Sequence, residues 1–356
     1  MQTALPLGIV ANPVSARDIR RVVANAGNLQ ITDRVNIVLR VLQAARAAGV
    51  EQALLMPDRG GIRALLERHL RRGDASLPAV HWLPMDPVSS VEDTFTATRL
   101  LCRAGVGVIV VLGGDGTHRA VVRELVSGSG PRPPIAGLST GTNNAFPELR
   151  EPTITGLAAG LLCAGRLAAA EVLVPNKLVE VCAGTQHDIA IVDAVVTHDR
   201  SVGARALWKT ESLDAAYLAF AEPQAIGLSA IGGLLDPVGR REPGGLAVQL
   251  AASVAQARVL LQVPIAPGMV RTVAVAGWQR MAAGVALPVR ASAGTVALDG
   301  ERELAFEPGA PVTMCLREDA FTTLDVARAM AVAARDGLFR LPVAPLAPLP
   351  PISPPP

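Results

Sequence analysis

The feature that most constrains the fold is the run Val106–Leu112 (VGVIVVL), which stands directly before the sequence GGDGT at 113–117 and a helical pattern over His118–Val126. A short apolar run without polar alternation is typical of a strand buried on both faces. In open parallel sheets, ligands collect at the carboxyl ends of such strands. The sequence therefore predicts that the 113–117 loop lies at a ligand-binding edge.

Strand and helix patterns alternate through residues 1–150. The expected strands are Leu7–Ala11, Gln52–Met56, Ala79–Leu83, Val106–Leu112 and Ile135–Leu138, and the expected helices are Asp33–Ala48, Ile62–Leu70, Ser89–Cys102 and His118–Val126. This alternation implies right-handed crossovers between parallel strands. We therefore predict an α/β fold whose N-terminal domain is a Rossmann-like, doubly wound parallel sheet.

The sequence pattern changes after residue 170, where short apolar runs such as Lys177–Cys182 and Ile189–Val196 stand between turn residues. Many short strands separated by turns are typical of an antiparallel sandwich. We expect a β-rich domain over 151–318, which would supply acceptor and nucleotide contacts, and a C-terminal helix over 319–340 that packs back on the first domain. The Pro-rich tail 341–356 is expected to be disordered or polyproline II.

Composition argues against several functional classes. The net charge of +2 and the 3% of aromatic residues do not fit the basic patches and stacking platforms of nucleic-acid binders. The apolar run Thr153–Gly165 stops well short of the ~20 residues that span a bilayer. The start of the chain lacks a signal-peptide pattern, so we expect a cytoplasmic protein without a membrane span. Cysteine and histidine spacings predict no protein metal site.

The 113–117 loop combines features that suit phosphate with one that does not. Gly113, Gly114 and Gly116 allow close approach of the backbone to a ligand, and the helix starting near Thr117 offers N–H groups and its positive dipole end. Asp115 would repel phosphate unless a metal or a reacting hydroxyl intervenes. It is therefore a candidate general base or organiser of a Mg²⁺ shell. The alternative is a tight strand-to-helix turn in which the aspartate is a cap.

Two further loops follow strand ends and carry hydroxyl and amide groups. Asn12 and Ser15 follow the first strand, where they could contact a nucleotide or form a turn or helix cap. The second loop consists of Thr140, Gly141, Thr142, Asn143 and Asn144. Such groups suit hydrogen bonding to ribose and base edges. Because the second loop follows a strand end and should share a rim with 113–117, we predict a nucleotide-binding cleft between these two loops.

Three features elsewhere have open interpretations. Asp193 lies inside the apolar run Ile189–Val196, where a carboxylate is costly unless it is partnered. The sequence Asp-Gly-Glu at 299–301 forms a good hairpin turn, or it contributes Glu301 to a site. The basic pair at 118–119 could neutralise phosphate charge or lie on an exposed helix surface.

The loop GGDGT resembles the signature of the superfamily that joins ATP-NAD kinases, diacylglycerol kinases and sphingosine kinases. NPVS at 12–15 resembles its NPxSG segment, with Ala16 in place of the usual Gly, and TGTNNAF at 140–146 resembles both the NAD-kinase TGT and the lipid-kinase GTxNxF segments. DGE at 299–301 resembles a lipid-kinase pattern. Overall, GIVANPVSARD, MPDRGG and LSTGTNNAFPE resemble the ATP-NAD kinase-like acetoin catabolism protein X family.

This resemblance implies an active site between two domains, where Mg²⁺-ATP lies against the 113–117 loop and Asp115 activates a hydroxyl of NAD or a similar acceptor. It places Glu301 near the transferred phosphate. It also assigns nucleotide contacts to Asp193 and, loosely, to Ser229, and it implies a homo-oligomer. Val192 replaces an Asn that NAD kinases carry, which weakens NAD as the acceptor. A lipid or small-polyol kinase and a non-catalytic nucleotide-binding accessory protein therefore stay as alternatives.

Overall fold

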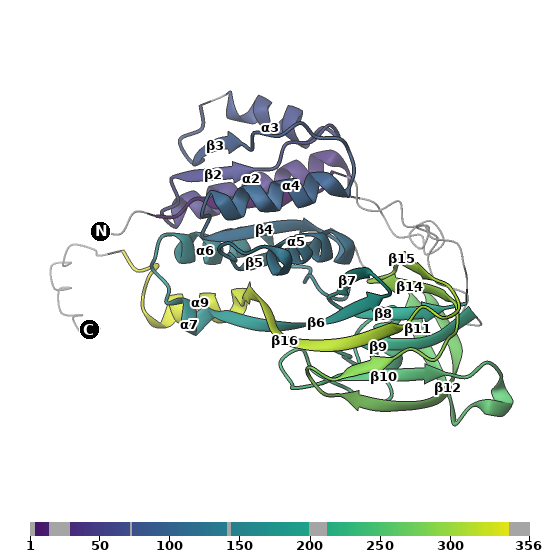
Figure 1. The fold of residues 1–356 in the computed structure, drawn as a ribbon. Helices are drawn as coiled ribbons and strands as arrows, with labels where there is room; N and C mark the ends of the chain where they lie inside the picture. The colour runs from purple at the N-terminus through teal and green to yellow at the C-terminus, as the bar shows by residue number, and fades with distance from the viewer. Residues whose placement is uncertain (1–3, 14–28, 72, 141–143, 199–211, 342–356) are drawn as a thin grey trace, which may run out of the picture.

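The structure is a computed structural model that describes residues 4–13, 29–71, 73–140, 144–198 and 212–341, without the side chains of 301–303. Within these residues the chain forms two sheets flanked by helices (Figure 1). The first, sheet A, is 9-stranded and has the order β3-β2-β1-β4-β5-β16-β6-β7, with β13 paired to β16. The second, sheet B, is 7-stranded and has the order β11-β12-β10-β9-β8-β14-β15.

The first five strands of sheet A are parallel, which confirms the predicted doubly wound sheet. These strands are β1 (Leu7–Ala11), β2 (Gln52–Leu55), β3 (Ala79–Trp82), β4 (Val108–Gly113) and β5 (Ile135–Ser139). The helices between and after them are α2 (Ile31–Ala47), α3 (Ile62–Leu70), α4 (Val91–Arg103), α5 (Asp115–Ser127) and α6 (Pro152–Cys163). Alternate residues of β4 enter two different cores, one with α4 and α5 and the other with α2, α3 and α6. Both faces of the sheet are therefore covered.

Sheet A continues from this parallel part into the β-rich part of the molecule. The strands that extend it are β6 (Leu173–Ala183), β7 (Gln186–Ala190), β13 (Ala286–Pro288) and β16 (Val312–Leu324). β16 pairs in parallel with β5 at one end and antiparallel with β6 along its length, and Figure 1 shows β6 and β16 running side by side toward sheet B. These two long strands join the two parts of the fold.

The expected helix over 319–340 was wrong at its start. Residues up to Leu324 belong to β16, because they pair with Leu173–Asn176 of β6. The helix α9 covers only Val326–Arg335 and begins at the N-cap Asp325, whose side chain accepts a hydrogen bond from the backbone N–H of Arg328. Helix α9 packs against α6 and the short α7 (Ala169–Val172), in the same core as β1. The tail from 342 onward lies outside the described residues.

Sheet B is antiparallel throughout. Its strands are β8 (Asp193–Thr197), β9 (Leu213–Leu218), β10 (Gly245–Leu250), β11 (Val259–Ala266), β12 (Met269–Met281), β14 (Gly294–Leu298) and β15 (Glu301–Phe306). A turn of 3-10 helix (Val254–Gln256) precedes β11. One face of sheet B shares a core with β6, β7 and β16, which forms the predicted sandwich. The helix α8 (Ser229–Gly233) packs on the opposite face, with β9, β10 and β11.

Two strand boundaries differ from expectation. The apolar run Ile189–Val196 is not one strand, because β7 ends in sheet A and β8 begins in sheet B, so the chain passes between the sheets at Ile191-Val192. Gly277, a residue type common in turns, instead lies within β12 beside a register shift against β10. A glycine at such a shift is typical of a β-bulge.

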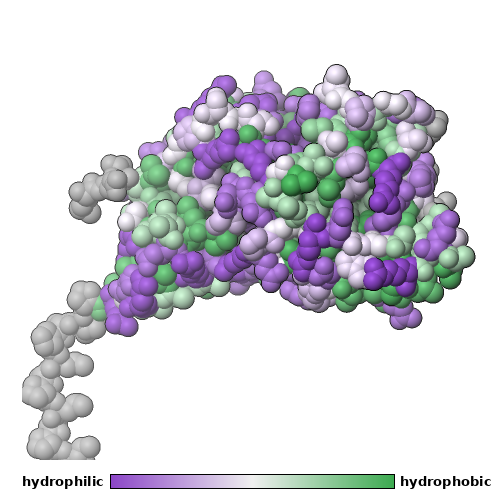
Figure 2. All heavy atoms as spheres, turned by 60° about the horizontal axis from the view of Figure 1, so that its bottom comes forward, coloured by the Kyte–Doolittle hydropathy of each residue, from purple (hydrophilic) through white to green (hydrophobic). Residues whose placement is uncertain are grey.

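The described part of the chain contains no helix long and apolar enough to cross a membrane. On the face shown in Figure 2, hydrophobic residues lie in groups between hydrophilic ones. The large hydrophobic residues that are exposed come from scattered elements, such as Val254, Val270 and Phe339. Scattered exposed hydrophobic residues are normal for a folded surface.

Candidate active site

The first and fourth strands bring two of the predicted loops together. Asn12, just after β1, donates from Nδ2 to Thr117 Oγ1 at 3.1 Å, and its backbone N–H donates to the carbonyl of Leu112. The carbonyl of Asn12 accepts from the guanidinium of Arg34 at 2.9 Å. Asn12 and Thr117 therefore lie together at one sheet edge, whereas Ser15 lies outside the described residues.

The glycines of the loop are required for close packing. A Cβ at Gly113 would lie 2.5 Å from Thr117 Cβ, and a Cβ at Gly114 would lie 2.8 Å from Asn144 Oδ1. Gly114 is the N-cap of α5 with φ −94°, and Gly116 lies inside the first turn of α5. These glycines keep the loop narrow without using the left-handed conformations that only glycine favours.

Replacing Gly113 by Ala should therefore destabilise the protein. The new Cβ would overlap the Thr117 side chain, and overpacking of this kind costs about 1–3 kcal/mol. Gly130→Ala is the matched control, because nothing lies within 4 Å of a Cβ at that position. Denaturant unfolding of both variants measures the difference. Equal free energies of unfolding for the two variants would contradict the packing role of Gly113.

Asp115 anchors the loop that follows β5. Its Oδ2 accepts from the backbone N–H of Ala145 at 2.9 Å, and its Oδ1 accepts from that of Phe146 at 2.8 Å. Asn144 donates from Nδ2 to Ser139 Oγ at 2.7 Å. Asp115 thereby holds the residues that follow the 140–144 loop against the first turn of α5.

The buried Thr140 donates from its backbone N–H to the carbonyl of Gly113 at 3.4 Å. The predicted convergence of the 113–117 and 140–144 loops is thus observed for Thr140 and Asn144. Gly141, Thr142 and Asn143 lie outside the described residues, so their nucleotide contacts stay predictions.

The hairpin predicted at 299–300 is present, and its aspartate has an additional function. Asp299 (φ +50°) and Gly300 (φ +88°) form the turn between β14 and β15. The Asp299 carboxylate turns inward and accepts the backbone N–H groups of Ile191, Val192 and Asp193 at 2.8–3.1 Å. It thereby provides hydrogen-bond acceptors for the backbone N–H groups at the point where the chain passes between the two sheets. Glu301 begins β15, but its side chain is outside the described residues.

Asp115 interacts electrostatically with buried charged groups from both parts of the fold. Burial, followed by the negative charge of Asp193, raises the pKa of Asp299 to about 8, and the charge of Asp115 acts in the same direction. Arg119, one turn after Asp115 on α5, counters this with Nε 3.9 Å from Asp299 Oδ2. The predicted candidates Asp115 and Asp193 therefore belong to one electrostatic group, which also contains Asp299 and Arg119.

The basic pair at 118–119 does not lie on an exposed helix surface. His118 is fully buried, its Nδ1 lies 2.9 Å from the carbonyl of Gly114, and burial lowers its pKa to about 4. The ring is therefore neutral near pH 7. Arg119 is also buried, and it pairs with Asp188 and Asp299 rather than facing outward. Both side chains are therefore part of the buried surroundings of the 113–117 loop.

Ser229 has a different environment from the other candidates. It is buried at the start of α8, and its hydroxyl has no hydrogen-bond partner in the described part of the chain. The core around α8 lies on the face of sheet B that does not meet sheet A. The structure thus places Ser229 in this core rather than among the residues gathered around Asp115.

Sequence reasoning missed two arginines near these loops. Arg34 is 2% exposed, and its spacing to Val38 and Val41 places it on the apolar face of α2, a signal that could have identified it. Arg240 donates to the carbonyls of Ala145 and Phe146, yet it stands in a loop beside a second arginine without any periodicity. No local pattern distinguishes it.

Within the described ranges, no group of three or more His, Cys, Asp or Glu side chains is arranged to hold a metal ion. The carboxylate of Asp299 is occupied by three backbone N–H groups, and that of Asp115 by two. Both are thus engaged by the protein backbone.

Comparisons with known proteins agree with this geometry. Residues 7–166 match the ATP-NAD kinase N-terminal domain, and residues 177–319 match the acetoin catabolism protein X C-terminal domain. The structure of yeast NADH kinase complexed with NADH superposes with a TM-score of 0.50 at 11% identity, covering 97% of this chain and 91% of that one. A diacylglycerol kinase from Bacillus anthracis str. Sterne gives a TM-score of 0.46 at 14% identity, covering 91% and 98%. The fold is of the NAD-kinase type.

The acetoin catabolism protein X of Cupriavidus necator (strain H16) is 56% identical over 347 residues, which cover 95% of each chain. This chain therefore belongs to the acetoin catabolism protein X family, as its sequence segments suggested.

Proposed function

We propose that this protein is an ATP-dependent phosphotransferase of the NAD-kinase type, which transfers a phosphoryl group to a hydroxyl of NAD or a similar ribose-bearing acceptor. The observation that carries the proposal is the position of Asp115. It lies in the first turn of α5, directly after the parallel strand β4, and it is held by the backbone N–H groups of Ala145 and Phe146.

The surroundings of Asp115 fit a nucleotide donor. The N-terminal end of α5 favours phosphate, and Gly113 and Gly114 before it allow Thr117 and Asn144 to pack closely against the loop. Asn12, Thr140 and Asn144 add amide and hydroxyl groups around the same edge. Mg²⁺ would arrive with the ATP phosphates and neutralise their charge.

In this account Asp115 accepts the proton of the acceptor hydroxyl. Positioning and charge neutralisation supply most of the acceleration of phosphoryl transfer, so the rigid support of Asp115 matters as much as its basicity. Asp193, at the start of β8, is the proposed contact for the acceptor, and Glu301 stays a candidate near the transferred phosphate. The proposal also includes a cytoplasmic location and a homo-oligomeric assembly, the latter implied by the resemblance to NAD kinases.

One observation favours a second function, that of a non-catalytic nucleotide-binding accessory protein. Asp93, in the first turn of α4, accepts the backbone N–H groups of Val88 and Ser89 at 2.7 Å, just as Asp115 accepts two consecutive N–H groups. An aspartate in the first turn of a second helix thus also holds two consecutive backbone N–H groups, although these lie four and five residues before it rather than in a distant loop. The presence of Asp115 is therefore not sufficient to establish chemistry.

Formation of NADP by the purified protein with Mg²⁺-ATP and NAD tests the proposed acceptor. Turnover would establish NAD as a substrate and make Val192 a tolerated replacement for the usual Asn. If both nucleotides bind without turnover, NAD is not the acceptor, and a panel of small polyols and lipids then separates another kinase from the accessory protein.

A further inference from the structure

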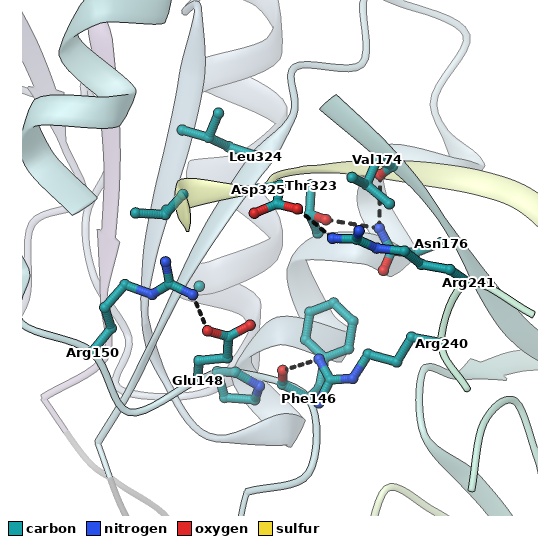
Figure 3. A pocket seen from close by; sticks show the side chains of 13 residues that line it. Phe146, Glu148, Arg150, Val174, Asn176, Arg240, Arg241, Thr323, Leu324 and Asp325 are labelled. Carbon is teal, nitrogen blue, oxygen red and sulfur yellow. Dashed lines mark hydrogen bonds and ion pairs between the residues drawn. The ribbon is translucent and has the colours of Figure 1, made fainter. Parts of the chain in front are cut away.

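Arg240 joins the β-rich part of the fold to the loop held by Asp115. It lies in the segment that leads into β10, and Figure 3 shows its guanidinium beside Phe146. Nη1 donates to the carbonyl of Phe146 at 2.7 Å, and Nη2 donates to that of Ala145. The guanidinium carbon lies 5.6 Å from the ring centre of Phe146 and 4.6 Å from that of Phe220. A planar fork of donors suits this double contact.

The two residues that Arg240 contacts are the same two that Asp115 holds. Asp115 accepts the N–H groups of Ala145 and Phe146, while Arg240 donates to their carbonyls. The segment 145–146 is thus bound from both sides, by an acidic side chain of α5 and by a basic side chain from the other part of the fold. Movement of either would displace the segment and change the support of the Asp115 carboxylate.

The loop that carries Arg240 is itself fixed from β6. Lys177 donates from Nζ to the carbonyls of Gly239, Glu242 and Gly244 at 2.6–3.0 Å. The backbone N–H of Gly244 donates to Glu318 Oε1 on β16 at 2.6 Å. The two long strands that join the sheets therefore also hold the loop, and a continuous series of hydrogen bonds runs from Lys177 through this loop to Asp115.

Arg241 shows what a neighbouring arginine without this role looks like. Its side chain is 64% exposed and forms an ion pair with Asp325, whereas that of Arg240 is 27% exposed and reaches the 145–146 segment. Both line a cavity of about 110 Å³ that also includes Asn176, but only Arg240 contacts the segment bound to Asp115. The two adjacent residues thus form a natural matched pair.

We propose that Arg240 is a positioning residue for phosphoryl transfer, which fixes the 145–146 segment so that the Asp115 carboxylate is correctly oriented toward the acceptor hydroxyl. This inference rests on the proposed function. It implies that the β-rich domain does more than hold the acceptor, because it also completes the support of the acidic group in the first domain.

The test compares Arg240→Ala and Arg240→Lys with Arg241→Ala. We expect Arg240→Ala to lower kcat by about 100-fold, as a misplaced catalytic group does, with less than a threefold change in KM for ATP. Added guanidinium ion should restore part of kcat in Arg240→Ala. Arg240→Lys keeps the charge but has a single donor nitrogen in place of the two that reach the carbonyls, so it should be intermediate. Arg241→Ala should stay within twofold of the wild type.

Hydrogen exchange at the amides of Ala145 and Phe146 gives a measurement that does not need activity. We expect these amides to exchange at least tenfold faster in Arg240→Ala than in Arg241→Ala or the wild type. If Arg240→Ala does not fold, the same comparison is made with Arg240→Lys, where a smaller acceleration is expected.

The two failures are distinguishable. A wild type without turnover on any acceptor would defeat the proposed function and, with it, the catalytic part of this inference, while faster exchange would still establish the hold on 145–146. In an active wild type, an Arg240 variant with the kcat and exchange of Arg241→Ala would overturn the role of Arg240. So would a loss of kcat that guanidinium does not relieve and that unfolding accounts for.

Discussion

Asp115→Asn is expected to lower the rate of NADP formation by at least ~100-fold, because an amide cannot take the proton of the acceptor hydroxyl. The substitution also disturbs the 145–146 segment. An asparagine presents one acceptor oxygen and one NH₂ group to two backbone N–H donors, so one buried donor loses its partner at a cost of about 1–3 kcal/mol. Activity and stability must therefore be measured together.

Asp93→Asn is the matched control for this effect. Asp93, in the first turn of α4, also holds two consecutive backbone N–H groups, which belong to residues four and five positions before it, whereas those held by Asp115 belong to a distant loop. We expect both variants to lose similar free energy of unfolding, while only Asp115→Asn loses turnover. An Asp115→Asn protein that keeps its turnover would remove Asp115 from the chemistry and leave it a purely structural role.

Asp299→Ala is expected to destabilise the protein by about 3–5 kcal/mol. It leaves three backbone N–H groups unpaired at the passage between the sheets and removes the side chain that lies 3.9 Å from Arg119 Nε. Asp319→Ala is the control, because Asp319 has the same positive φ of 50° but is exposed. Denaturant unfolding measures both. A loss confined to the few tenths of a kcal/mol typical of surface positions would contradict the role of Asp299.

The titration of Asp299 makes its contribution to the free energy of unfolding depend on pH. Its pKa is about 8 in the folded protein, against an ordinary value of 3.8, so the folded state binds the proton more tightly than the unfolded state. This contribution to stability is complete below about pH 4 and is lost as the pH rises through 8. Asp299→Asn cannot titrate, so the wild-type advantage over this variant should shrink between pH 4 and 8. A constant difference over that window would show that burial does not raise the pKa of Asp299.

Most of the parallel sheet could be predicted from local patterns. The apolar run of β1 and the helical spacing of α3 gave the observed boundaries, because their periodicity is set by neighbours in the sequence. The meeting of Asn12, Thr117, Thr140 and Asn144 follows from one rule, that the carboxyl ends of parallel strands share an edge.

The junction between the sheets could not be predicted, because its causes are distant in sequence. The break between β7 and β8 carries no polar signal before Asp193, and the carboxylate that stabilises it lies 107 residues beyond Val192. Arg240 stands 94 residues from Phe146, so nothing near it reveals its contact. The strand at the end of β16 was taken for helix, since its pairing with β6 is equally non-local.

The most direct test of the central claim is transfer of the labelled γ-phosphate of ATP by the wild-type protein, with Mg²⁺ and an acceptor panel that includes NAD, NADH, small polyols and lipids. The account predicts that the wild type and Asp93→Asn transfer the label to a nucleotide acceptor, whereas Asp115→Asn does not. Binding of ATP without a labelled product from any acceptor would contradict it, and would make the protein a nucleotide-binding accessory protein built on a kinase fold.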